Sequence, residues 1–302
     1  MRQLIVLVAV LMLTACSSSG QKNSVENPYA ERSKELSSNG VAAMQRERWP
    51  VAEKLFERAL QAAQLANDPD LVAGAWYNLG MLHVSAGDHQ KGEAALKHAS
   101  SVAEQHQLEV SNMRAKVALA LLFQKQGRQG WQPDVLGSAY PADIHLIAAR
   151  LSQIQQRYDV ARREYEFVLR NSEANRAAML YKTEAHMGLA LLAEQQQDHE
   201  GAVREATLVL KLSREIGAPR LAAHALLLQA TLTQNEAAKR DGLRSALAIY
   251  RALQDLHGQS DTLHQLMHIT DLEGNPSELK RLQSELDLVG ERMVDTQESE
   301  RN

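Results

Sequence analysis

Two groups of residues have the types and spacing that metal or acid–base chemistry would use. His264 and His268 are four residues apart, so on a helix they share one face and could both bind a metal ion. The run Asp198-His199-Glu200 places an imidazole between two carboxylates. No third ligand accompanies the histidine pair, and a short polar run is typical of a turn. We therefore expect solvated histidines, a structural turn, and no metal or cofactor.

The longer motifs that mark catalytic sites are absent from the sequence. It has no Gly-rich phosphate loop, no His-Glu-x-x-His and no Gly-x-Ser-x-Gly. This favours a protein that is not an enzyme. The alternative is an enzyme, or an enzyme-regulatory subunit, whose site has no known motif. A pocket with convergent polar groups between repeats would indicate that alternative.

Cys16, the only cysteine, directly follows an apolar segment at the N-terminus. Residues 4–13 are all apolar, which is too short for a membrane span of roughly 20 residues but typical of a signal-peptide core. Residues 13–16, Leu-Thr-Ala-Cys, resemble the lipobox of bacterial lipoproteins, in which the cysteine is lipidated. The resemblance implies a signal peptide at 1–15 and a membrane anchor of acyl chains, such as palmitate, on Cys16. A plain secretory signal would not explain why the sole cysteine lies there.

The segment 16–30 begins with small polar residues and is predicted to be a flexible tether. Position 17 is Ser and not Asp. In lipoproteins of Gram-negative bacteria, this implies export to the outer membrane. The expected location is therefore the bacterial cell envelope, on the periplasmic side of the outer membrane if the host is Gram-negative.

Composition excludes one class of partner and indicates the fold class. The formal net charge is −4, which argues against nucleic acid because its binding requires a basic face. Aromatic residues make up only 4% of the chain, while Ala, Leu, Gln, Glu and Arg, which favour helices, are abundant. No segment shows convincing strand-type alternation. The sequence therefore predicts an all-α protein.

Small residues recur at steps of 40 or 41 residues within each half of the chain. They are Gly40, Gly80 and Ala120 in the first half, and Ala149, Ala190 and Ala230 in the second. Trp76, Leu79 and Gly80 form a Trp-x-x-Leu-Gly motif, and Gly87 follows at a turn. This pattern resembles the tetratricopeptide repeat, a pair of antiparallel helices. The resemblance implies an α-solenoid of about six to seven helix hairpins. The longer-than-usual period implies a longer helix or a longer loop.

One step of the repeat is short. Ala120 and Ala149 are only 29 residues apart, and the segment between them is rich in Gly and Pro. We predict that the third repeat is irregular and has lost most of its second helix. The predicted organisation is N-terminal repeats at 31–130, an irregular connector at 131–140, C-terminal repeats at 141–256, a degenerate capping hairpin at 257–293 and a disordered tail at 294–302.

In such solenoids the first helix of each hairpin lines the concave, partner-binding face. Counting the small residue as position eight, positions five and nine point to that face. They lack the Lys and Asn with which some family members clamp a C-terminal carboxylate, and they suit an apolar or amphipathic segment of a protein partner. The predicted groove consists of Tyr77, Met81, Val117, Leu121, Leu146, Arg150, Met187, Leu191 and Leu227. Some of these side chains could instead pack between hairpins.

Trp131, in the connector, is a second candidate. It is either a further contact for a partner or a plug over the shortened third repeat. Anchor, tether and repeats together predict a non-enzymatic scaffold that recruits or assembles envelope partners, such as secretion, pilus or cell-wall components. A self-associating structural protein of the envelope is the other alternative.

Overall fold

The computed structural model describes residues 27–44, 48–128, 130–132, 134–171, 176–272 and 274–301. The predicted signal peptide, Cys16 and the tether up to residue 26 lie outside the described residues. Helices and their connections make up the whole described part, which confirms the all-α prediction. The helices are α2 (Pro28–Met44), α3 (Trp49–Ala66), α4 (Pro69–Ser85), α5 (His89–Gln105), α6 (Glu109–Lys125), α7 (Ala142–Ile154), α8 (Tyr158–Asn171), α9 (Arg176–Gln195), α10 (His199–Ile216), α11 (Pro219–Leu232), α12 (Glu236–Leu253), α13 (Leu256–Leu272) and α14 (Pro276–Arg301).

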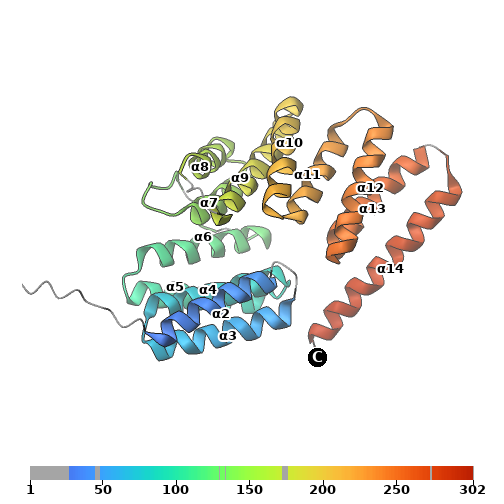
Figure 1. Cartoon of the computed structure of the whole chain (residues 1–302). Coiled ribbons are helices and arrows are strands. Elements are labelled where there is room, and N and C mark those ends of the chain that lie inside the picture. Colours follow the sequence, from blue (N-terminus) through green and yellow to red (C-terminus); the bar gives the residue numbers. More distant parts are fainter. Residues whose placement is uncertain are drawn as a thin grey trace, which may run out of the picture.

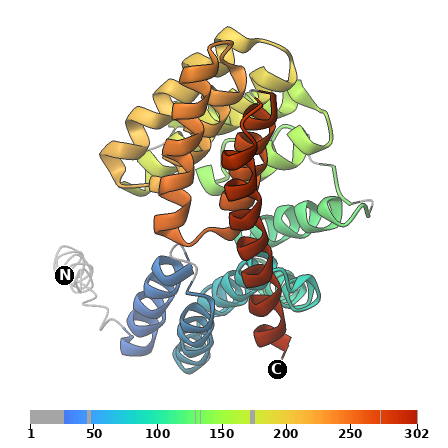
Figure 2. The same cartoon turned by 90° about the vertical axis from the view of Figure 1, so that its right-hand side faces the viewer.

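Consecutive helices form hairpins that follow one another along a curved array (Figures 1 and 2). The pairs are α2–α3, α4–α5, α7–α8, α9–α10, α11–α12 and α13–α14, and α6 stands alone between the second and third pairs. First helices of neighbouring hairpins also contact each other, as α2 does α4 and α7 does α9. We call the surface formed by the first helices the first-helix face. These helices are α2, α4, α6, α7, α9, α11 and α13. This architecture confirms the predicted α-solenoid.

Glycines allow the two helices of the first two hairpins to approach closely. A Cβ added to Gly40 would lie 2.4 Å from Phe56 Cε1, and one added to Gly80 would lie 2.6 Å from Leu96 Cγ. Real Cβ atoms do not come this close to a neighbouring carbon. Phe56 and Leu96 are fully buried at these crossings. The small residue of the repeat is therefore the crossing point of each of these hairpins.

The turns between hairpins are short. Asn67 ends α3 in the left-handed conformation (φ 53°), and the Asp68 side chain caps α4 by accepting from the backbone N–H groups of Asp70 and Leu71. Gly217 likewise ends α10 in the left-handed conformation (φ 67°), and α11 begins two residues later. Since the helices of the first two hairpins contain 17 or 18 residues each, the 40-residue period comes from long helices and not from long loops.

The third repeat is irregular, as predicted. After α6, the described residues of 126–141 form turns and extended chain but no helix. Leu136 and Tyr140 from this connector pack against Val117, Ile144 and Ile147. Trp131 is 41% exposed. Leu136 and Tyr140 therefore cover the junction of α6 and α7, and the role of Trp131, as a contact or as a plug, stays a prediction.

Two predicted boundaries differ from the structure. Helix α2 already begins at Pro28, because the Asn27 side chain accepts from the N–H of Tyr29 and donates to the carbonyl of Ala66. At the other end, α14 continues to Arg301, through the tail that we expected to be disordered. That tail contains no Gly or Pro after Gly290 and is rich in residues that favour helices, so nothing in its sequence ends the helix.

Candidate peptide-binding site

All nine predicted groove residues lie on first helices, namely on α4, α6, α7, α9 and α11. Positions five and nine are four residues apart, so the two side chains of each helix lie on one face. Helix-to-helix packing therefore brings the predicted residues onto the first-helix face.

Three of the nine residues are buried, which corrects the predicted groove. Val117 packs against Ile144 and Ile147, between α6 and α7. Leu146 lies in the core that α7 forms with α8 and α9, and Met187 in the core that α9 forms with α10 and α11. These side chains hold neighbouring hairpins together and leave almost no surface for a partner, as the packing alternative allowed.

The other six retain surface. Leu191 is 39% exposed and Arg150 is exposed, whereas the four residues Tyr77, Met81, Leu121 and Leu227 are half-buried. Burial, with a contribution from the Asp143 carboxylate, raises the pKa of Tyr77 well above its ordinary value, so its phenol is neutral at physiological pH. These six residues stay predicted contacts.

A row of polar residues runs beside the apolar ones, and Arg150 is its one predicted member. Arg114 on α6 donates to both carboxylate oxygens of Asp143 at the start of α7, at 2.6 and 3.4 Å. Arg150 on α7 pairs with Glu184 on α9 at 3.2 Å. Burial alone would lower the pKa of Arg114, but the hydrogen bond to Asp143 raises it. These ion pairs link successive first helices across the repeats.

The positions of these residues within the repeat could have indicated the row. Arg114, Asp143 and Glu184 each lie six residues before the small residue of their repeat, at position two. Positions two, five and nine are three and four residues apart and share one helix face. The first-helix face is therefore mixed, with half-buried apolar side chains next to ion pairs.

Asp198, His264 and His268 were considered above for acid–base or metal chemistry. Asp198 has a structural role, and the two histidines are exposed. Asp198 is the N-cap of α10, and its carboxylate accepts from the backbone N–H of Gly201 at 2.8 Å. His264 and His268 are exposed on α13. In the described ranges, no three His, Cys, Asp or Glu side chains lie close enough to hold a metal ion. Among the helices described, none combines the length and apolar character needed to cross a membrane.

The fold is an α-solenoid of antiparallel helix hairpins. Residues 36–105, which include most of α2 to α5, match the tetratricopeptide repeat family. Such repeats generally mediate interactions between proteins, and the comparison supports this coarse role for the chain. No curated protein matches the chain.

Two solved structures are similar to most of the chain. BtubC from P. vanneervenii is 15% identical with a TM-score of 0.46, over 83% of this chain and 91% of that chain. A signal transduction ATPase with numerous domains from Pyrococcus horikoshii, which has a tetratricopeptide repeat sensor, is 16% identical with a TM-score of 0.40, over 88% of this chain and 45% of that chain. Neither likeness indicates a function.

Proposed function

We propose that the protein is a lipid-anchored scaffold of the bacterial envelope that binds protein partners through its first-helix face and catalyses no reaction. The observation that carries this proposal is the mixed row of positions two, five and nine on successive first helices. It supplies exposed apolar surface at Leu191, half-buried apolar surface at Met81 and Leu121, and charge at Arg150 and Glu184. An amphipathic segment of a partner matches that combination.

The first test compares two exposed apolar residues of equal accessibility. Leu191 on α9 is 39% exposed on the first-helix face, and Val203 on α10 is 40% exposed on a second helix. Leu191→Asp should abolish capture of partners from detergent-solubilised envelope, because a carboxylate on the binding surface must be desolvated without a partner. Val203→Asp should leave capture unchanged. Equal capture by both variants would refute the assignment of the binding face.

The second test concerns the anchor. The lipid on Cys16 would fix where a partner is held, while the solenoid would do the binding. Since one acyl chain gives only marginal membrane binding and more than one gives stable anchoring, Cys16→Ser should move the protein from the membrane to the soluble fraction. Circular dichroism should show unchanged helix content. A Cys16→Ser protein that still sediments with membranes would exclude the lipid anchor.

A further inference from the structure

A cavity of about 350 Å³ lies between the second helices α12 and α14 of the last two hairpins. Both helices pack against α13, which separates them. The buried side chains of Leu247, Leu266 and Leu282 form its floor, and arginines form its rim. We call it the arginine groove. It is lined mainly by the second helices α12 and α14 and by none of the nine predicted groove residues.

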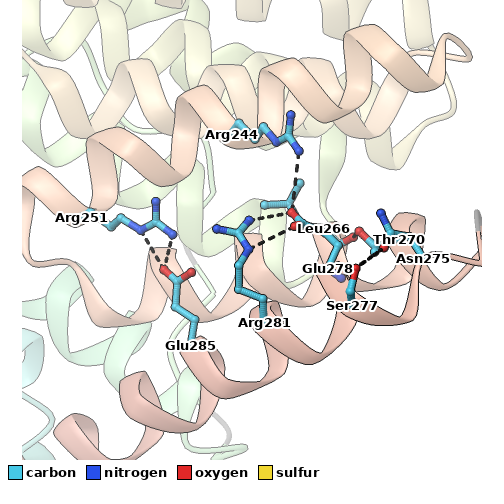
Figure 3. Close-up of polar contacts among 9 residues, drawn as sticks. All are labelled: Arg244, Arg251, Leu266, Thr270, Asn275, Ser277, Glu278, Arg281 and Glu285. Carbon is cyan, nitrogen blue, oxygen red and sulfur yellow. Dashed lines mark hydrogen bonds and ion pairs between the residues drawn. The ribbon is translucent and has the colours of Figure 1, made fainter.

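Two of the rim arginines are matched by carboxylates of α14 (Figure 3). Arg251 donates to Glu285 through Nε at 2.8 Å and also through Nη2. Arg281 donates to Glu278 through Nε at 3.1 Å and Nη2 at 2.6 Å. The Arg281 pair uses both oxygens of Glu278, the two-point contact that a guanidinium and a carboxylate form, whereas both nitrogens of Arg251 donate to Oε1 of Glu285.

Arg244 differs from these two arginines. Its Nη2 atom comes no closer than 3.7 Å to Glu278, the carboxylate that Arg281 already holds, and its side chain is 56% exposed. Figure 3 shows Arg244 and Arg281 reaching toward Glu278 from opposite helices. Among the described residues that form these pairs, three guanidinium groups face two carboxylates, so positive charge exceeds negative charge in this set.

The spacing indicates what kind of anion would fit. Arg244 and Arg251 are seven residues apart on α12, which on a helix is about 10 Å along one face. Glu278 and Glu285, which pair with this row, have the same spacing on α14. The groove therefore already holds two carboxylates presented by one helix, and Arg244, whose pair with Glu278 is long, is the guanidinium best placed to take a further carboxylate.

We propose that the arginine groove binds an acidic segment of a partner protein, one of whose carboxylates forms a two-point ion pair with Arg244. Arg240 also lines the groove and has an interaction of its own, and the proposal does not depend on it. This site is separate from the first-helix face. It gives the scaffold a second contact, which selects partners by charge.

Fluorescence anisotropy with a labelled oligoglutamate peptide and the full-length chain in non-ionic detergent tests the proposal. The wild type should bind the peptide at low salt. Arg244→Gln should weaken binding about 5-fold, as expected for a partly exposed ion pair, and Arg244→Lys should weaken it less. The matched control is Arg204→Gln on α10, whose exposed side chain also has a 3.7 Å ion pair, with Glu200. It should leave binding unchanged.

Three results would overturn the proposal. The first is no binding of oligoglutamate to the wild type. The second is an equal loss in Arg244→Gln and Arg204→Gln, which would mean non-specific attraction. The third is binding of inorganic phosphate without binding of the peptide, which would assign the groove to phosphate. Leu191→Asp should bind oligoglutamate normally, so failure of this site and failure of the first-helix face are distinguishable.

Discussion

The second and third repeats differ in what packs over the small residue of their first helix. In the second repeat, α5 crosses α4 where Gly80 makes room for Leu96. In the third repeat the described residues between α6 and α7 form no second helix, and the connector passes over α6 instead. A Cβ added to Gly130 would lie 3.4 Å from the Ala120 carbonyl oxygen, so the connector passes over the small residue where a second helix would cross. The crossing point is kept although the helix is lost.

The two repeats also differ in how backbone polar groups are satisfied. A helix bonds its own N–H groups, whereas an irregular segment needs other partners. The N–H of Leu136 donates to Glu164 Oε1 at 2.7 Å, and Glu164 Oε2 lies 2.5 Å from His145 Nδ1. His145 stacks on Phe167, and Glu164 and His145 are each 1% exposed. Replacing a helix by a loop here thus depends on a buried polar network from α7 and α8.

The largest effect should come from breaking that network. Glu164→Ala leaves the Leu136 N–H and the His145 ring buried without their acceptor, so the free energy of unfolding should fall by about 3–5 kcal/mol. Urea titration followed by circular dichroism measures it. Glu166→Ala is the matched control, because Glu166 lies on the same helix in a half-exposed pair with Arg170. It should cost less than about 1 kcal/mol. Similar losses in both variants would contradict the role of the network.

A smaller effect is expected at the regular crossing. Gly80→Ala places a methyl group 2.6 Å from Leu96 Cγ and should destabilise the protein by about 1–3 kcal/mol through overpacking. Gly74→Ala on the same helix meets no atom within 4 Å and should stabilise it by about 0.5–1 kcal/mol, since Ala favours a helix over Gly. Thermal unfolding of the two variants compares them. Melting temperatures that shift in the same direction would exclude close approach as the function of Gly80.

The smallest effects on the free energy of unfolding are expected in the connector. Leu136→Ala removes a side chain packed on Val117 and Ile144 and should cost about 1–2 kcal/mol. Trp131→Ala should change the free energy of unfolding by less than about 0.5 kcal/mol, because Trp131 is partly exposed and belongs to none of the core clusters of the described residues. A larger loss from Trp131→Ala than from Leu136→Ala, measured by urea titration, would favour Trp131 as a plug over Trp131 as a contact for a partner.

The sequence was sufficient to predict the architecture, because a close crossing of two helices requires a small residue at that point. Gly40 and Gly80 mark them directly, and the short step from Ala120 to Ala149 marks the irregular repeat. The Glu164–His145 network had no such marker, since the partners come together only when the connector packs on α7 and α8. Burial of Val117, Leu146 and Met187 likewise depends on the angle between hairpins, which the period does not determine.

The polar row could have been predicted from the repeat positions but was not. Arg114, Asp143 and Glu184 share a repeat position, yet each looks like an ordinary surface charge when its helix is considered alone. Only the contact between successive first helices turns them into ion pairs. The position of a side chain in the repeat was therefore predictable, and its partner was not.

Photocrosslinking in cells tests the central claim most directly, that partners bind the first-helix face. A photoreactive amino acid would replace Leu191 in one full-length variant and the equally exposed Val203 in another. The account predicts a crosslink to a discrete envelope protein from position 191 and none from position 203. The same crosslinks from both positions, or a crosslink only from 203, would contradict it.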